Sequence, residues 1–273
     1  MTGADKLPLL QAVDIALCYP GSRDYVFSDI SFAVHEREVV ALLGESGCGK
    51  TTLLHIAGGL LAADAGYVAF HGEKFQTTPT KISIVFQDAC LLPWLTVKGN
   101  VAFALSLKSL FVPPGEREQR VRAALREVGL EDAGHKYPAQ LSGGMAQRAA
   151  LARTLARQAE LVLLDEPFSS LDAITRKSMQ DLLLDIIHKS GTSALIVTHD
   201  MDEALMIADR LLLMTKEAGK TKFVSWDLES LLGKAADGAA RRNRRTAVFQ
   251  DLREEIASRL APSNGGKAVE AIP

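Results

Sequence analysis

The sequence predicts an α/β protein with a mainly parallel β-sheet that helices cover on both faces. Three observations support this fold class. Short apolar runs alternate with helical stretches along the chain. Runs such as Leu161–Leu164 are apolar at every position, which is typical of strands buried on both faces. The apolar run Val39–Leu43 leads directly into a glycine-rich loop, and from Thr51 onward apolar residues recur at helical spacing.

The first part of the chain predicts an antiparallel β subdomain. Two β-rich runs, Leu10–Cys18 and Val26–Val34, are separated by Pro20–Gly21, and Pro-Gly is a typical turn sequence. We therefore expect a hairpin here.

The remaining elements follow from the same patterns. Further strands are expected at 67–70, 82–86, 161–164, 194–198 and 210–214. One helix is expected over Pro114–Val128 and a second after Ser142, with Met145, Ala149, Ala152 and Leu155 on one face. A third helix should begin near Asp172 and bury Met179, Leu183, Ile186 and Ile187.

Composition excludes several classes of protein. The 273 residues are 47% hydrophobic and 23% charged, with a net charge of -2, which is ordinary for a soluble domain and predicts no nucleic-acid partner. No apolar run approaches the roughly 18 residues that a bilayer span needs. The start shows no secretory signal, so we expect a cytoplasmic protein. The three cysteines, Cys18, Cys48 and Cys90, suggest neither disulfides nor a zinc site.

The glycine-rich loop matches the phosphate-binding pattern G-x-x-x-x-G-K-[ST]. It comprises Gly44, Glu45, Ser46, Gly47, Cys48, Gly49, Lys50 and Thr51, followed by Thr52. Backbone N–H groups of such a loop, with the positive end of the next helix, surround a phosphate. Lys50 is expected to reach the β- and γ-phosphates of a nucleotide, and the Thr51 hydroxyl to bind Mg²⁺. The alternative is a glycine-rich turn that binds nothing.

An acidic pair follows one of the buried strands. Asp165 and Glu166 end the run Leu161–Leu164, and the carboxyl ends of parallel strands border the ligand crevice. Asp165 is expected to hold Mg²⁺, and Glu166 to act as general base on the attacking water. An acidic pair in this position can also be an ordinary loop or helix start.

The stretch Leu141-Ser-Gly-Gly-Met-Ala-Gln-Arg148 resembles the signature motif of ATP-binding cassette (ABC) proteins, which other phosphate-loop proteins lack. Ser142 is a good helix N-cap, and Gly143 and Gly144 leave N–H groups open at the positive end of that helix. The resemblance implies that this helix end binds the nucleotide of a second subunit. It thus implies a phosphate-loop NTPase core with a helical subdomain that carries the signature motif.

Other motifs of the family occur in the family's order. The resemblance implies that Tyr19 stacks on adenine, that Gln87 contacts Mg²⁺ and the water, and that His199 contacts the γ-phosphate. It also implies that Ser170-Leu-Asp172 is the D-loop, with Asp172 directed at the partner's nucleotide. Each residue taken singly has a plainer interpretation, as a hairpin residue, an exposed polar residue or a structural histidine.

A narrower resemblance concerns the segments between the motifs. Val85 to Val101, Asp165 to Arg176, and Val197 to Ala204 are similar to the ATPases of nitrate, sulfonate and taurine importers. Near the end, Arg241 to Arg245 precede Phe249, Leu252, Ile256 and Leu260 at helical spacing, which resembles the short C-terminal helix of that group.

The resemblance implies a division of the chain and a set of partners. Residues 1–233 would form the ATPase domain, with the helical subdomain at about 90–157, and residues 234–273 a basic linker, a short helix and a disordered tail. The cofactors would be ATP and Mg²⁺. The partners would be a second copy, membrane permease subunits and, indirectly, an extracytoplasmic solute-binding protein, which places the chain peripherally on the cytoplasmic face of the inner membrane.

Several alternatives stay open at this point. The chain could serve an exporter, act as a soluble ABC protein on DNA or ribosomes, or bind ATP without hydrolysing it. Leu91-Leu-Pro-Trp94 is either an exposed permease-docking cluster or part of the core. Cys48 is either a thiol with a lowered pKa beside Lys50 or an inert small residue.

Overall fold

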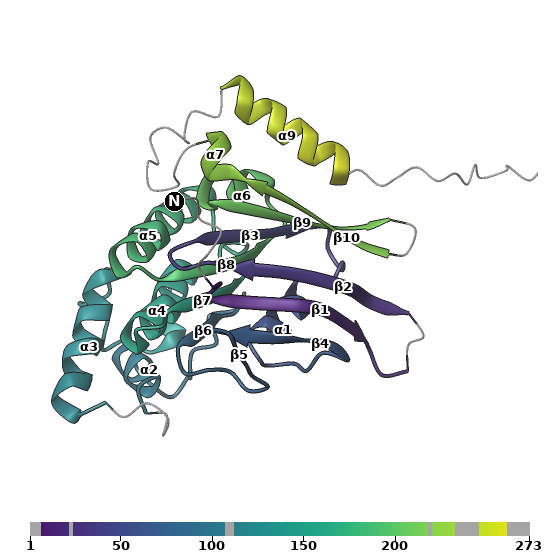
Figure 1. The fold of residues 1–273 in the computed structure, drawn as a ribbon. Helices are drawn as coiled ribbons and strands as arrows, with labels where there is room; N and C mark the ends of the chain where they lie inside the picture. Colours follow the sequence, from purple (N-terminus) through teal and green to yellow (C-terminus); the bar gives the residue numbers. More distant parts are fainter. Residues whose placement is uncertain (1–6, 22–23, 107–111, 218–219, 233–245, 261–273) are drawn as a thin grey trace, which may run out of the picture.

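A computed structural model describes residues 7–21, 24–106, 112–217, 220–232 and 246–260 (Figure 1). Its strands are β1 (Leu10–Cys18), β2 (Tyr25–Val34), β3 (Val39–Gly44), β4 (Ala65–Phe70), β5 (Glu73–Lys74), β6 (Ile82–Val85), β7 (Leu161–Asp165), β8 (Ser193–Thr198), β9 (Arg210–Glu217) and β10 (Lys220–Asp227). Its helices are α1 (Lys50–Ala57), α2 (Val97–Phe103), α3 (Pro114–Glu127), α4 (Gly143–Arg157), α5 (Ala173–Ser190), α6 (Met201–Ile207), α7 (Leu228–Leu232) and α9 (Ala247–Leu260), with a 3-10 turn at Pro138–Gln140.

The larger sheet has the strand order β10-β9-β3-β8-β7-β6. All neighbours in it are parallel except β10 and β9, which form an antiparallel hairpin at the edge. The prediction of a mainly parallel sheet is therefore confirmed. Because the parallel strands end at one edge, the loops that follow β3, β6, β7 and β8 gather there.

The smaller sheet is antiparallel, with the order β2-β1-β4-β5. β1 and β2 form the predicted hairpin, with Leu10 opposite Val34 and Cys18 opposite Tyr25. β4 pairs with the other side of β1. The N-terminal antiparallel subdomain expected from the sequence is thus present.

Two apolar cores occupy the two faces of the larger sheet. Along β3, Val39, Ala41 and Leu43 belong to the core shared with helices α2 to α6. Val40 and Leu42 point to the opposite face, where they pack with α1 and the antiparallel sheet. Successive side chains of a strand point to opposite faces, so one fully apolar strand serves both cores.

The predicted helices occur where expected. α5 buries Met179, Leu183, Ile186 and Ile187, as its spacing indicates. Helices α2, α3 and α4 pack against one another beside the sheet (Figure 1). α4, which carries Ser142 at its N-cap, also contacts α5.

The C-terminal helix α9 packs on α7 and β9 (Figure 1). Phe249, Leu252 and Ile256 are buried in the core, as the helical spacing predicted. Arg253 forms an ion pair of 3.0 Å with Asp202 of α6. The basic run Arg241–Arg245 and the tail from Pro262 lie outside the described residues.

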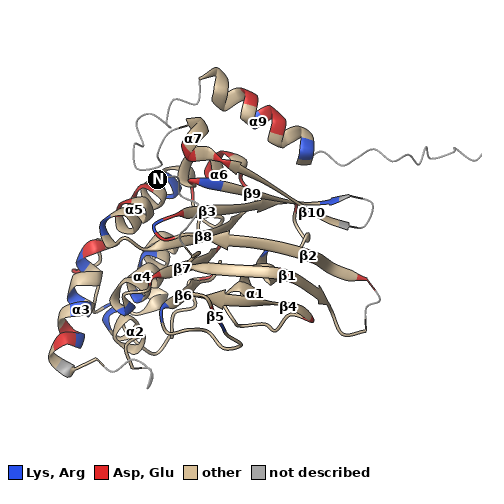
Figure 2. Ribbon diagram, viewed as in Figure 1, with Lys and Arg blue, Asp and Glu red and all other residues tan. Residues whose placement is uncertain are grey.

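The described surface carries both signs of charge. Along α3 and α9, basic and acidic side chains alternate, whereas the strands are mostly uncharged (Figure 2). Several charges are paired within a helix, such as Arg120 with Glu116 and Arg259 with Glu255. Within the described ranges, every helix is too short or too polar to traverse a lipid bilayer.

Candidate nucleotide-binding site

The phosphate loop lies between β3 and α1, at the edge where the parallel strands end. Gly49 precedes α1 with φ of 106°, a conformation that glycine adopts readily. A Cβ there would also lie 2.9 Å from Val26 Cγ1 and 3.0 Å from Phe27 Cδ1 of β2. Glycine is therefore required both for the backbone turn and for close packing of the loop on the antiparallel sheet.

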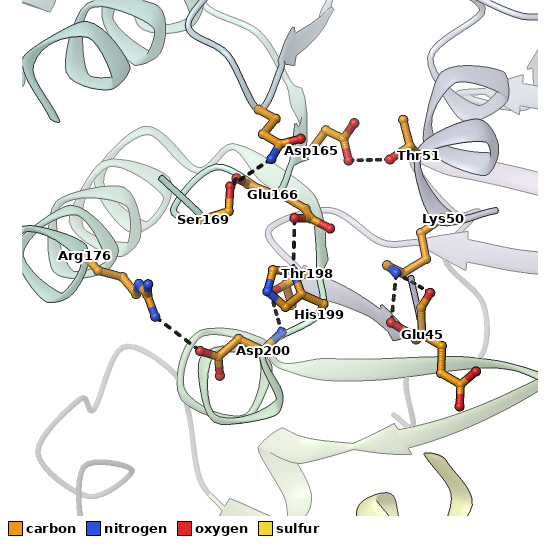
Figure 3. Close-up of polar contacts among 12 residues, drawn as sticks. Glu45, Lys50, Thr51, Asp165, Glu166, Ser169, Arg176, Thr198, His199 and Asp200 are labelled. Atoms are coloured by element: carbon orange, nitrogen blue, oxygen red, sulfur yellow. Dashed lines mark hydrogen bonds and ion pairs between the residues drawn. The ribbon is translucent and has the colours of Figure 1, made fainter. Parts of the chain in front are cut away.

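Lys50 is buried under this loop. Its Nζ donates hydrogen bonds of 2.8 Å to the carbonyl oxygens of Gly44 and Glu45 (Figure 3). Its ammonium group is thus held at the base of the loop, while Glu45, Ser46 and Gly47 are exposed around it. This arrangement offers a fixed positive charge and backbone donors to a phosphate.

Thr51 and Asp165 meet across the site. The Thr51 hydroxyl donates a 2.9 Å hydrogen bond to Asp165 Oδ1 (Figure 3). Burial raises the pKa of Asp165, and the hydrogen bond from Thr51 opposes this effect. Two ligand oxygens on one octahedral Mg²⁺, each bonded at about 2.0–2.1 Å, are separated by about 2.9 Å. The two oxygens therefore fit a shared magnesium ion in both type and spacing.

Glu166 follows β7 with an unusual backbone conformation. Its φ is 43°, in the left-handed region that non-glycine residues rarely occupy. Its N–H donates to Val197 O, and its carbonyl accepts from the Ser169 hydroxyl. The side chain then lies 3.0 Å from His199 Nδ1 through its Oε2 (Figure 3). Such strain, fixed by surrounding bonds, is typical of functional positions.

Gln87 lies at the same edge of the sheet, where its hydrogen bonds are with Ser169 and Gln147. Its Nε2 donates to Ser169 Oγ at 3.3 Å, and its backbone carbonyl accepts from Gln147 Nε2 at 2.6 Å. Gln87 thereby links the loop after β6 to the loop after Glu166 and to α4. Its side chain is exposed, so its amide oxygen is available to a bound cation.

Tyr19 lies at the end of β1, on the antiparallel sheet. The residue is 49% exposed, and its hydroxyl shares a 2.7 Å hydrogen bond with Thr52 Oγ1. An exposed ring beside the phosphate loop can stack on a base. Thr52, in turn, connects Tyr19 to the first turn of α1.

The signature residues lie on a different helix from Lys50. Ser142 caps α4 by accepting a 3.3 Å hydrogen bond from Met145 N, and Gly143 is open to solvent on its Cβ side. Asp172 caps α5, and hydrogen bonds from Thr175 hold the pKa of its carboxyl below the usual range. These two helix ends face outward, where a second molecule can reach them.

Two of the open questions are answered by burial. Trp94 is 70% exposed, so it is not part of the core. Cys48 is buried, and desolvation raises the pKa of its thiol although Lys50 acts in the opposite direction. The idea of an activated thiol beside Lys50 is therefore wrong, because burial outweighs the nearby positive charge.

No role follows from the sequence for Arg176, Asp200 or Glu203, which lie beside Glu166 and His199. Asp200 caps α6 by accepting from Glu203 N at 3.0 Å. The D-x-x-E spacing that begins right after His199 is a capping-box signal and could have indicated this helix start. Arg176 bonds to Asp200 from α5 (Figure 3), a contact with no local sequence signal.

The fold and this group of residues define a phosphate-loop nucleotide-binding protein. The family model described as "ABC transporter" matches residues 27–169, more than half of the chain. The chain belongs to the ABC transporter family and is an ATP-binding cassette ATPase.

Individual relatives agree with this assignment. The chain is 44% identical to a taurine import ATP-binding protein of Chromobacterium violaceum, over 77% of this chain and 80% of that protein. It is 45% identical to an aliphatic sulfonates import ATP-binding protein of Burkholderia cenocepacia, over 71% and 70% of the two chains. Among solved structures, the ATP-binding cassette MJ0796, a dimer bound to ADP and phosphate, superposes with a TM-score of 0.69 at 28% identity, over 80% of this chain and 98% of that one.

Proposed function

We propose that this ATPase hydrolyses MgATP at two sites shared between two copies of itself and thereby drives uptake of a small solute through a membrane permease. The observation that carries the proposal is the meeting of three chain segments at one sheet edge. Lys50 and Thr51 come from the phosphate loop, Asp165 and Glu166 from the end of β7, and His199 from the end of β8.

Each residue has a distinct task in this reaction. Lys50 and the loop N–H groups bind the phosphates. Thr51, Asp165 and the Gln87 amide oxygen would hold Mg²⁺, which would supply positive charge to the phosphate oxygens. Glu166 orients the attacking water and accepts its proton, and His199 contacts the γ-phosphate while its Nδ1 faces the Glu166 carboxylate.

The second copy completes each site. The open N-terminus of α4, with Ser142, Gly143 and Gly144, offers N–H donors and a positive helix end to a phosphate. As the resemblance to ABC proteins implies, this end serves the nucleotide of the partner, together with Asp172. One γ-phosphate held from both sides joins the two copies, and its release after hydrolysis lets them separate.

Import is supported by the two curated relatives, whose names describe uptake of taurine and of aliphatic sulfonates. The cargo we propose is of that kind, a small sulfonate or a related anion such as nitrate. A permease would bind at the exposed Trp94, and a solute-binding protein outside the membrane would deliver the solute. The chain would then work at the cytoplasmic face of the inner membrane.

The variant Glu166→Gln tests the shared-site mechanism. It removes the base but keeps the shape of the side chain, so ATP should bind without turnover and hold two copies together. We expect phosphate release to fall by orders of magnitude and the mass in light scattering to double with ATP. Glu229→Gln, on the short helix α7, serves as the matched control. A Glu166→Gln variant that stays monomeric with saturating ATP would contradict the shared sites.

Transport direction and cargo need a separate measurement. Vesicles that contain the permease, with this chain inside and the solute-binding protein outside, should accumulate labelled taurine, an alkanesulfonate or nitrate in an ATP-dependent way. Efflux of the label under the same conditions would refute import and leave the ATPase chemistry intact.

A further inference from the structure

Arg176 joins two loops that flank the proposed hydrolysis site. It lies in the first turn of α5, and its guanidinium group donates through Nη2 to the carbonyl oxygen of Leu171 at 3.1 Å. Through Nη1 it lies 3.4 Å from Asp200 Oδ2 (Figure 3). One rigid, planar guanidinium group therefore holds both the loop that ends at Asp172 and the loop that follows His199.

The acceptor on the first side belongs to the connection between Glu166 and α5. This connection is fixed by short-range bonds, from Ser169 N to Glu166 O and from Leu171 N to Phe168 O. Leu171 is buried, so its carbonyl cannot move freely. Arg176 thus binds the last rigid point before Asp172, the residue proposed to face the partner's nucleotide.

The acceptor on the second side is next to His199 in the chain. Asp200 N donates to Thr198 Oγ1 at 3.0 Å, and Asp200 Oδ1 accepts from Glu203 N at 3.0 Å. These bonds leave Oδ2 to Arg176, so the turn Thr198–Asp200 is fixed at three points. The position of the His199 ring opposite Glu166 depends on this turn.

Arg176 also balances negative charge in a confined space. A cavity of about 40 Å³ is lined by Glu166, Ser169, Arg176, Thr198, His199, Asp200 and Glu203. Burial raises the pKa of Glu203 to about 8, the charge of Asp200 adds to this effect, and Arg176 opposes it. Arg176 is the one Lys or Arg among these lining residues, so removal of its charge would break the ion pair with Asp200.

We propose that Arg176 is a positioning residue that ties the segment Ser170–Asp172 to His199, so that a change at the partner's site is transmitted to the hydrolysis site of the same chain. This inference rests on the proposed two-site mechanism. It predicts that the two nucleotide sites are coupled through Arg176, although Arg176 itself contacts neither nucleotide. The energy of such a coupling is carried by a rigid connection between two loops that each contact a different site.

The test compares Arg176→Gln with Lys177→Gln, which removes the same charge from the adjacent, exposed position on α5. Loss of positioning should lower kcat by about ten- to a hundredfold and leave KM for ATP unchanged, since Arg176 does not bind ATP. The Hill coefficient for ATP should fall towards one. In the nucleotide-free protein, the NMR signals of the His199 ring should shift. Lys177→Gln should change none of these.

A conservative variant separates positioning from folding. Arg176→Lys keeps the charge, but one ammonium group cannot engage both acceptors, so kcat and the Hill coefficient should be intermediate. It also provides the same measurements if Arg176→Gln cannot be purified.

Other outcomes would overturn the inference. One is that Arg176→Gln, or Arg176→Lys in its place, matches Lys177→Gln in every measurement. Another is that Arg176→Gln lowers kcat while both the His199 NMR signals and the Hill coefficient stay as in the wild type. An inactive or strictly monomeric wild-type protein would instead refute the proposed function itself.

Discussion

Two buried side chains near the site, Cys48 and Glu203, have protonation states that their surroundings determine. Cys48 lies within the phosphate loop, and burial raises the pKa of its thiol. Glu203 lies behind His199 on α6, and burial raises its pKa to about 8. At neutral pH Glu203 therefore keeps a proton that an exposed carboxyl loses, and Cys48 holds its thiol proton more firmly than an exposed cysteine does.

The reactivity of Cys48 follows from its raised pKa. Only the thiolate reacts with alkylating reagents, so at pH 7.5 Cys48 should be modified by iodoacetamide more slowly than the exposed Cys90. Mass spectrometry of the labelled peptides over time measures both rates in one sample. ATP should slow the reaction of Cys48 further and leave Cys90 unaffected. Faster labelling of Cys48 than of Cys90 would contradict the burial argument.

The buried carboxyl of Glu203 makes stability depend on pH. Its pKa is near 4.5 in the unfolded chain and about 8 in the folded chain, so the folded state binds the extra proton between these values. The stabilisation by the protonated form is complete below about pH 4.5 and is lost as the pH rises through about 8. Over this window the free energy of unfolding should fall by at most about 1.4 kcal/mol per pH unit.

Glu203→Gln tests this because its amide stays neutral. In urea titrations, the stability of the variant relative to the wild type should increase from pH 5 to pH 8. Glu254→Gln, at an exposed position of α9, should show no such trend. A difference between Glu203→Gln and wild type that is constant with pH would show that Glu203 has an ordinary pKa.

At the scale of elements, the close contact between α4 and α5 depends on one glycine. A Cβ on Gly144 would lie 2.7 Å from Thr175 Cγ2. Thr175 cannot easily turn away, because its hydroxyl donates a 2.6 Å hydrogen bond to Asp172. The start of the signature helix is therefore packed directly against the start of α5.

Gly144→Ala should thus destabilise the protein, with Gly143→Ala as its matched control. Overpacking at such a contact costs about 1–3 kcal/mol. Gly143 has no atom within 4 Å of an added Cβ, and alanine in a helix can gain up to about 1 kcal/mol over glycine. Urea unfolding without nucleotide measures both variants. Equal stability of the two variants would mean that α4 and α5 separate without cost.

The elements that could be predicted from the sequence are those with a strong local pattern. The fully apolar β3 and β7 and the amphipathic α5 are examples. β10 was not predicted, because its polar and apolar residues are mixed and only pairing with β9 makes it a strand. α2 has only seven residues, too few for a helical period to be recognised.

The residues of the site divide in the same way, into those that a local sequence pattern indicates and those that only the folded structure brings together. The motifs predicted one shared site, and the structure brings four of its residues to one sheet edge because each follows a parallel strand: Lys50, Gln87, Glu166 and His199. The bond between Glu166 and His199 depends on the strained φ of Glu166, which no residue pattern indicates. Arg176 could not be assigned a role, since its partners Leu171 and Asp200 meet only when α5 and α6 are packed together.

At the scale of the whole molecule, the exposed Trp94 is the best candidate for contact with the permease. A large aromatic side chain at the centre of an interface typically contributes about 2 kcal/mol or more. Trp94→Ala should therefore weaken binding to the permease about thirtyfold and leave the affinity for ATP unchanged. Tyr25→Ala, on the antiparallel sheet and also exposed, is the control. Equal losses of permease and ATP binding would exclude a docking role.

Tyr19 follows β1 of the antiparallel sheet, whereas Lys50 begins helix α1, which follows β3 of the parallel sheet. The hydrogen bond between Tyr19 and Thr52 joins these two parts at the site. In our proposal the antiparallel sheet contacts the base, and the parallel sheet carries out the chemistry on the phosphates. The two tasks can therefore evolve independently. An exchange of Tyr19 can therefore change how tightly the base is held, while the residues that cleave the phosphate bond stay unchanged.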